Sequence, residues 1–205
     1  PDNCADLVIS AILFSSGKCG IEEASRQAEM MTEREMREII KATLKDIQPH
    51  DSVWREFEFV DFIFQATVSA SCFAQLKRHR MATIAAQPYI PDAPVRIPES
   101  ATGSEEIFNT ACQRSAQLYQ KIMDSSGREV AEYALLNAHR RRVLIGMNLR
   151  ELYHFSRLRS DMHAQWEIRE LSESICALVR DEAPMTSVLL GGKDSFKELK
   201  KKLGD

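Results

Sequence analysis

The sequence contains no apolar run that approaches the roughly 18 residues a membrane-spanning helix requires. Its N-terminal segment also lacks the basic stretch and the small-residue cleavage pattern of a signal peptide. We therefore expect a cytoplasmic protein that has no membrane partner. Because the chain begins at Pro1, we also expect a processed or trimmed start.

Metal-binding motifs are missing as well. The 5 cysteines lie at scattered spacings and include no CxxC pair, which favours buried thiols in a reducing compartment over zinc or disulfide chemistry. The 5 histidines form no HExxH motif and no close cluster with acidic residues. The sequence therefore predicts no metal site.

No strong excess of one charge is present, since 27 Lys and Arg residues stand against 30 Asp and Glu residues and leave a formal net charge of −3. Such a chain has no overall basic field to attract nucleic acid, so we expect no nucleic-acid partner. GxGxxG, P-loop, GxSxG and internal-repeat patterns are also absent. Any site for an anion must therefore be built locally.

The 205 residues are 44% hydrophobic, which is enough apolar material for one sizeable core and predicts a single domain over residues 1–205. Most of the chain shows the spacing of amphipathic helices. This spacing predicts helices over residues 6–14, 22–47, 104–127, 148–159 and 163–182, a helix that begins near Arg128, and a short Lys-rich helix at the C-terminal end.

Other patterns indicate strands and turns. Residues 50–52 predict a turn, and the alternation of apolar and polar residues from Glu56 to Val68 predicts a strand. Four prolines within residues 87–101 favour a surface loop or an irregular sheet edge over a central strand. The apolar stretch Arg142–Met147 is compatible with either a buried strand or a helix.

Two segments concentrate polar groups more than a simple core needs. The first follows Ser69 or Ser71, either of which can cap a helix whose last turn would carry Arg78, His79 and Arg80. These three residues either complement the dipole of that helix or form a fork that binds a pyrophosphate. In the second segment, residues 148–169, basic residues at helical spacing form either a packing helix or a binding site.

The order of residues in these segments carries a resemblance. The run NLRELYHFSRLRSDMHAQWEIR, from Asn148 to Arg169, closely resembles the C-terminal signature of the flavin-dependent thymidylate synthases. The run QLKRHR, from Gln75 to Arg80, resembles the start of the RHR motif of the same family. The resemblance implies an α/β (α+β) fold, in which helices pack on an antiparallel sheet, and a homotetramer with FAD bound where subunits meet.

The resemblance also implies roles for single residues. Arg159 falls on a family Arg that reaches both flavin and nucleotide, so we expect it to be catalytic and, with Gln75, to bind the substrate. His154 replaces a family Asn, although an imidazole can still donate or accept a hydrogen bond. The residues expected to bind FAD are Arg78, His79, Arg80, Asn148, Arg150, His154 and His163.

The implied reaction is that of a nucleotide-biosynthesis flavoprotein and methyltransferase. NADPH reduces the flavin, methylenetetrahydrofolate donates a one-carbon unit, and dUMP or a related pyrimidine nucleotide is methylated at C5. The chain departs from the family where the nucleotide is held, because Glu132 replaces an Arg that binds the phosphate. Further departures stand where the family has Asn, Glu, Ser and Arg, at Ala85, Ala86, Pro88 and Ile90.

These departures leave three hypotheses open. Losing roughly three phosphate donors costs on the order of 4 to 9 kcal/mol of binding energy, unless a shifted register brings Arg96 to the phosphate. The chain is then a thymidylate synthase, a divergent flavoprotein that has kept FAD but lost dUMP, or a non-catalytic subunit. Retention of Arg78, Arg150 and Arg159 counts against the non-catalytic subunit. Polar groups that converge on one place cost free energy when no ligand pairs with them.

Overall fold

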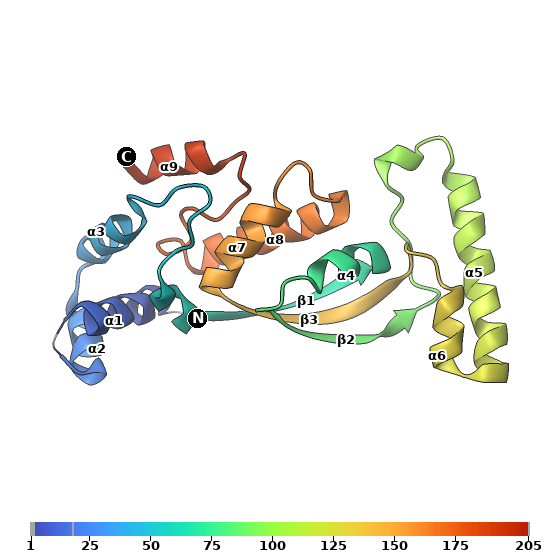
Figure 1. Ribbon diagram of the computed structural model, residues 1–205, viewed down its shortest axis with the longest axis horizontal. Helices are drawn as coiled ribbons and strands as arrows, with labels where there is room; N and C mark the ends of the chain where they lie inside the picture. The colour runs from blue at the N-terminus through green and yellow to red at the C-terminus, as the bar shows by residue number, and fades with distance from the viewer. Residues whose placement is uncertain (1–2, 18, 205) are drawn as a thin grey trace. The chain divides into compact units, whose positions relative to one another are not determined.

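The structure is a computed structural model that describes residues 3–17 and 19–204 (Figure 1). Pro1, and with it the expected processed start, lies outside the described residues. The chain divides into a first unit, Pro1–Ile63 with Gly146–Asp205, and a second unit, Phe64–Ile145. The single domain expected over residues 1–205 stays a prediction, and each unit is described by itself.

A small antiparallel sheet accompanies the helices. Its strands follow the order β1-β3-β2. At one end of the β1-β3 pair, the Leu149 N–H donates to the Val60 carbonyl at 2.7 Å, and at the other end the Ala70 N–H donates to the His139 carbonyl at 3.0 Å, which is the pairing of antiparallel neighbours. The α+β fold class is confirmed. The strands are β1 Asp61–Ser69, β2 Thr83–Ile90 and β3 Arg140–Asn148.

The strands resolve two open expectations. The stretch Arg142–Met147 is a strand, and β3 is the central strand of the sheet. The proline-rich segment begins as an edge, as expected, because Pro88 lies in β2 and β2 has a neighbour on one side only. An edge strand tolerates proline, which has no N–H to give to a second neighbour.

The first unit contains most of the helices. Phe57, Phe155 and Ile168 are among its fully buried side chains, and they come from three different elements. Within the described residues, no helix is both long and apolar enough to cross a bilayer. The elements are α1 Cys4–Ser16, α2 Ile21–Met30, α3 Glu33–Leu44, the 3-10 helix η1 Arg55–Phe59, α7 Leu149–Arg159, α8 Trp166–Glu182 and α9 Phe196–Gly204.

The single helix expected over residues 22–47 is wrong, because the chain breaks between α2 and α3. Thr32 caps α3: its hydroxyl accepts from the Glu35 N–H at 3.3 Å, and the Glu35 carboxylate accepts from the Thr32 N–H at 2.8 Å. This reciprocal pair satisfies backbone donors that a new helix start would leave open. The strand expected from Glu56 also begins later, at Asp61, because η1 precedes it.

In the second unit, α4 is shorter than expected. Ser69 caps it by accepting from the Cys72 N–H at 3.1 Å, and the helix ends at Leu76. The prediction of a basic last turn is wrong, since residues 78–80 follow the helix in a turn. The helices of this unit are α4 Ala70–Leu76, η2 Glu99–Ala101, α5 Glu105–Ser126, α6 Arg128–Ala131 and η3 Glu132–Ala134.

Two further boundaries follow from local chemistry. Gly127 separates α5 from α6 with a φ of 83°, a conformation that glycine adopts without strain, as the sequence predicts. In the first unit, α8 begins at Trp166 rather than at His163. The side chain of Gln165 accepts from the Ile168 N–H and so fixes the later start.

Candidate functional site

The residues expected from the sequence fall in both units. Gln75 and the basic triplet Arg78–Arg80 belong to the second unit. The residues of the C-terminal run, Asn148 to His163, belong to the first. The structure therefore gives the local geometry of two groups, which are described in turn.

The basic triplet directs its side chains to different environments. The His79 N–H donates to the Leu76 carbonyl at 3.0 Å, and the His79 carbonyl accepts from the Ala82 N–H at 3.1 Å. This turn leaves His79 only 5% exposed, whereas Arg78 and Arg80 are exposed. The two arginines are therefore accessible to an anion, whereas His79 is buried.

Next to the triplet, β2 is tied to β3 by an arginine that the sequence did not single out. Arg141 donates from Nε to the Gln87 carbonyl at 2.7 Å, and its guanidinium lies 4.1 Å from the centroid of the Tyr89 ring. Tyr89 is thus covered by a cation on its own sheet. Ala85 and Ala86, which replace a family Asn and Glu, are exposed and carry no polar side-chain atoms.

In the first unit, α7 forms one wall of a cavity of about 280 Å³. Arg150, His154 and Arg157 lie on one face of this helix, because spacings of four and seven residues return to the same side. The turn around Asp51 and the side chain of Lys193 complete the wall. The lining residues are Pro49, His50, Asp51, Ser52, Arg150, Tyr153, His154, Arg157, Leu158 and Lys193.

Two arginines fix the wall of this cavity. Arg150 donates from Nε to the Val53 carbonyl at 2.8 Å and from Nη1 to the Glu58 carboxylate at 2.8 Å. Arg157 donates from Nη1 to the Asp51 carbonyl. Burial lowers the pKa of the Arg157 guanidinium from its usual value. Both cations therefore hold the backbone of residues 51–58 against α7.

The other residues expected from the C-terminal run are arranged differently. The Asn148 side chain accepts from the Glu151 N–H at 2.8 Å and so caps α7. Arg159 lies nine residues after Arg150, which places it about 180° away around the helix. His163 is exposed beyond the end of α7. The described lining of the cavity thus includes Arg150 and His154 but none of these three residues.

Tyr153 anchors the same helix from inside. Its side chain is buried, its hydroxyl donates to the Thr186 carbonyl at 2.8 Å, and the hydroxyl also accepts from the Leu189 N–H at 3.5 Å. Burial raises the pKa of the Tyr153 phenol well above its usual value. The neutral phenol is therefore part of the folded structure.

The wild type should lose stability at alkaline pH, and we expect the replacement Tyr153→Phe to remove this loss. The folded pKa lies above the unfolded one, so the neutral phenol stabilises the fold fully below the unfolded value of about 10, and this stability falls as the pH rises above it. Urea denaturation of both proteins at about pH 7 to 11 measures the effect. Equal slopes of unfolding free energy against pH would contradict the assignment.

The comparisons with known proteins bear on both groups. The model of a family described as "Thymidylate synthase complementing protein" matches residues 3–185. The chain belongs to this family. The family resemblance of Gln75–Arg80 and Asn148–Arg169 is thus confirmed.

Relatives of this thymidylate synthase complementing protein family carry the name flavin-dependent thymidylate synthase. The protein of Geobacter sulfurreducens is 34% identical over 146 residues, which are 66% of this chain and 62% of the relative. That of Thermococcus onnurineus is 35% identical over 116 residues (51% and 47%), and that of Pyrococcus abyssi is 35% identical over 136 residues (60% and 54%). The match thus spans about half to three fifths of the length of these relatives.

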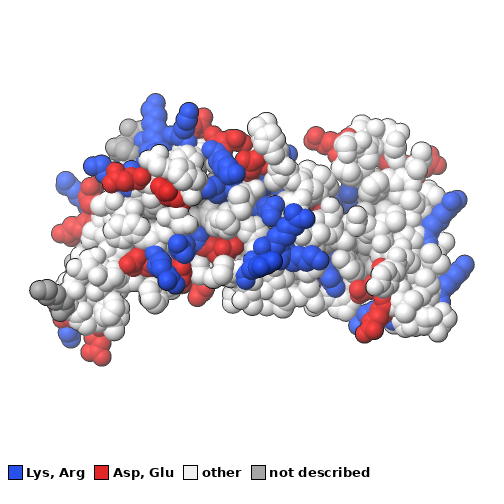
Figure 2. Space-filling view, viewed as in Figure 1, with Lys and Arg blue, Asp and Glu red and all other residues white. Residues whose placement is uncertain are grey.

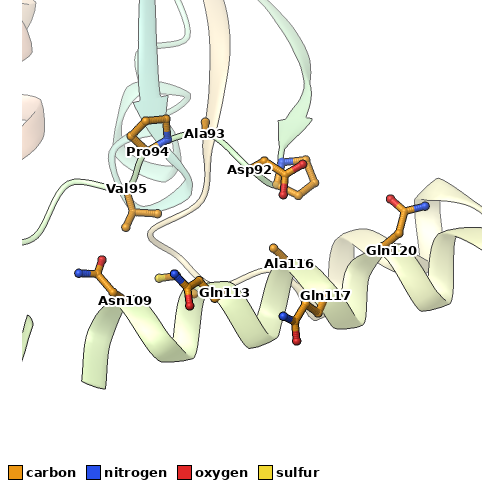
Figure 3. Close-up of a pocket in the computed structure, with 11 residues that line it drawn as sticks. Asp92, Ala93, Pro94, Val95, Asn109, Gln113, Ala116, Gln117 and Gln120 are labelled. Carbon is orange, nitrogen blue, oxygen red and sulfur yellow. The ribbon is translucent and has the colours of Figure 1, made fainter. Parts of the chain in front are cut away.

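A second cavity of this family member lies within the second unit and has a different character. It measures about 510 Å³ and lies between residues 91–95 and α5. Figure 3 shows Asn109 and Gln113 on the stretch of α5 that lies below Pro94 and Val95. Asp92 is the one charged residue of its described lining, so this cavity offers no cation to a phosphate.

Charge elsewhere is mixed. In Figure 2, the Lys and Arg side chains form small separate groups among acidic and uncharged ones, and no single basic field covers the face shown. Among the described residues, no group of three or more His, Cys, Asp or Glu side chains could hold a metal ion.

Sequence reasoning missed several residues of the α7 cavity. Arg157 shares the spacing of Arg150 and His154, and that spacing was a usable signal. The turn at Asp51 was predicted as a turn, but its place in the cavity was not. Lys193 gave no signal, because only the folded path of the chain brings it to α7.

Proposed function

We propose that this chain binds FAD and acts as a thymidylate synthase of the flavin-dependent type. The substrate would be dUMP or a related pyrimidine nucleotide, methylated at C5 with methylenetetrahydrofolate and NADPH as co-substrates. We further propose a homotetramer, as the family resemblance implies, and a cytoplasmic location. The observation that supports the flavin most directly is that Arg150 and His154 line one basic cavity.

The residues of this cavity fit the phosphate-bearing part of a flavin dinucleotide. Arginine and lysine donors suit phosphate oxygens, and Leu158 and Tyr153 add apolar surface. At about 280 Å³, the cavity has room for part of a dinucleotide rather than the whole molecule. Arg78 and Arg80 are exposed in the second unit, and the family resemblance implies that they also bind FAD.

The chain's own groups would position and stabilise the reactants. When bound, the flavin supplies hydride transfer between the reductant and the nucleotide. Arg150 and His154 would hold the cofactor. Arg159, on the other face of α7, would bind the nucleotide together with Gln75 and offset the negative charge that develops on the pyrimidine.

A second candidate function follows from β2. A divergent flavoprotein that keeps FAD but has lost dUMP is favoured by the exposed Ala85, Ala86 and Pro88, since none of them offers a side-chain donor to a phosphate. Glu132 adds a negative charge where the family has an Arg. This candidate differs from the first in the substrate, not in the cofactor.

The visible spectrum of the purified full chain separates the two candidates. We expect a flavin absorption band on addition of FAD, and a shift of that band when dUMP is titrated in. Release of tritium from dUMP labelled at C5, with NADPH and methylenetetrahydrofolate supplied, then tests turnover. A flavin band that does not shift on addition of dUMP, together with no release of tritium, would support the second candidate. The absence of a flavin band would refute both candidates.

The variant Arg78→Ala tests the role of the basic triplet. Because Arg78 is exposed, we expect weaker FAD binding, by about tenfold or more for the loss of a charged hydrogen bond, without a change in thermal stability. Lys77→Ala, which alters an exposed neighbour at the end of α4, serves as the control. Unchanged flavin affinity in Arg78→Ala would refute the assignment.

A further inference from the structure

The segment that follows α8 returns to α7 and is held by hydrogen bonds to α8, to α7 and to the turn after α7. Arg180 donates to the Leu190 carbonyl at 2.6 Å, and the Gly191 N–H donates to the Ser156 hydroxyl at 3.2 Å. Three residues further on, the Asp194 carboxylate accepts from the Met162 N–H at 3.2 Å. We call residues 190–196 the return segment. Lys193 is its middle residue and is placed by contacts on both sides.

The packing of the return segment is close. A Cβ added to Gly192 would collide with the backbone carbonyl of Ser160, so glycine permits the approach. At the end of the segment, the Phe196 ring lies against the Arg157 guanidinium, with 5.5 Å between the guanidinium carbon and the ring centroid. The return segment therefore joins Lys193 to the same helix face that carries Arg157.

The cationic side chains that line the cavity differ in the contacts that they already make within the protein. Arg150 is paired with Glu58, with 2.8 Å between nitrogen and oxygen. Arg157 donates to the Asp51 carbonyl and packs on Phe196. Lys193 also lines the cavity, and among the described residues none forms an ion pair or a hydrogen bond with its ammonium. Its charge is available to a ligand.

We propose that Lys193 binds a phosphate group of the ligand that occupies the α7 cavity. Residue 193 lies beyond residues 3–185, which the family model matches, so the family match assigns it no role. The proposal rests on the proposed function, because it takes the ligand to be a flavin or a nucleotide. A phosphate from either source would replace the water around an exposed ammonium with a charge-assisted hydrogen bond.

The test compares phosphorylated and phosphate-free ligands on the full chain. Dissociation constants are measured by flavin fluorescence for FAD and for riboflavin, with Lys193→Ala, Lys193→Arg and the control Lys197→Ala. Lys197 is an exposed lysine of α9 that does not line the cavity. We expect Lys193→Ala to weaken FAD binding about tenfold at low salt, less at high salt, because the lost contact is charged and exposed. Riboflavin affinity should stay unchanged, and Lys193→Arg should restore FAD binding.

A second arm identifies the source of the phosphate. With flavin bound, dUMP and deoxyuridine are titrated into the wild type and Lys193→Ala. Weaker dUMP binding with unchanged FAD binding supports the proposal with the nucleotide as the source. Wild-type affinities for both FAD and dUMP in Lys193→Ala would overturn it, and so would an equal loss of FAD and riboflavin.

Failure of the proposed function has a separate readout. If the wild type binds neither flavin nor dUMP, calorimetric titration with inorganic pyrophosphate tests whether Lys193 binds phosphate groups. Pyrophosphate binding that Lys193→Ala loses and Lys197→Ala keeps supports the anion site. Absence of pyrophosphate binding to the wild type, or equal binding by Lys193→Ala, overturns it.

Discussion

Replacing Arg150 by alanine should remove most of the flavin affinity and also lower the stability of the first unit. Arg150 makes two hydrogen bonds, to the Val53 carbonyl and to the Glu58 carboxylate. The side chains of Arg150 and Glu58 are only 34% and 27% exposed, so the variant would leave a half-buried carboxylate without its partner. We expect a loss of about 1 to 3 kcal/mol in the free energy of unfolding, measured by urea denaturation.

The effect of Arg150→Ala on flavin binding should be of the same size as its effect on the fold. A guanidinium that donates to a phosphate contributes about 1.5 to 3 kcal/mol, which is roughly one to two decades of affinity. The visible spectrum under FAD titration, at a temperature where the variant is folded, measures this loss. Flavin affinity equal to that of the wild type would remove Arg150 from the site.

Glu58→Gln is the matched control for the structural part of that effect. It breaks the same ion pair but leaves the guanidinium in place, because glutamine has nearly the shape of glutamate. We expect a comparable loss of stability with most of the FAD affinity retained. If Glu58→Gln lost as much FAD affinity as Arg150→Ala, Arg150 would act by holding residues 53–58 rather than by contacting the ligand.

Much of the fold could be predicted because local chemistry marks its boundaries. Asn148 and Gly127 stand at a helix start and a helix end, and both boundaries lie where the sequence predicts them. The break at Thr32 was also written in the sequence, as a Thr followed three residues later by Glu. The break was missed because the helical spacing of apolar residues continues from Ala28 to Ile40 across it. Such spacing does not show whether the chain changes direction between two helices.

The ambiguity of Arg142–Met147 has a different origin. Burial along β3 does alternate, since Val143, Ile145 and Met147 are buried, but Leu144 between them is apolar although it is 48% exposed, so the sequence shows an apolar run and hides the alternation. Length and spacing alone do not separate such a run from a short buried helix. The hydrogen bonds of β3 to its two neighbours, which are non-local, decide the matter.

The candidate site was predictable in residue type but not in arrangement. The helical spacing of Arg150 and His154 placed them together, and the structure confirms that they share a wall. The same spacing puts Arg159 on the opposite face of α7. Lys193 could not be predicted, because its position depends on contacts such as Gly191 with Ser156, which join distant parts of the chain.

Phe57→Ala should cause the largest loss of stability among these variants. Phe57 is 0% exposed, and its ring meets the Tyr153 ring edge-on at 6.0 Å between centroids. Deleting a buried Phe side chain costs about 3 to 5 kcal/mol, and the aromatic pair adds about 0.5 to 1.5 kcal/mol. A lower denaturation midpoint, with an unchanged dependence on urea, measures this loss.

The control for Phe57→Ala lies in the same 3-10 helix. Phe59 is 68% exposed, so Phe59→Ala should change the free energy of unfolding by less than about 1 kcal/mol. Because Phe57 supports Tyr153 and lies between the two partners of Arg150, Val53 and Glu58, its loss should weaken flavin binding as well. Equal destabilisation by the two variants would show that η1 does not anchor α7, and the cavity wall would then need another support.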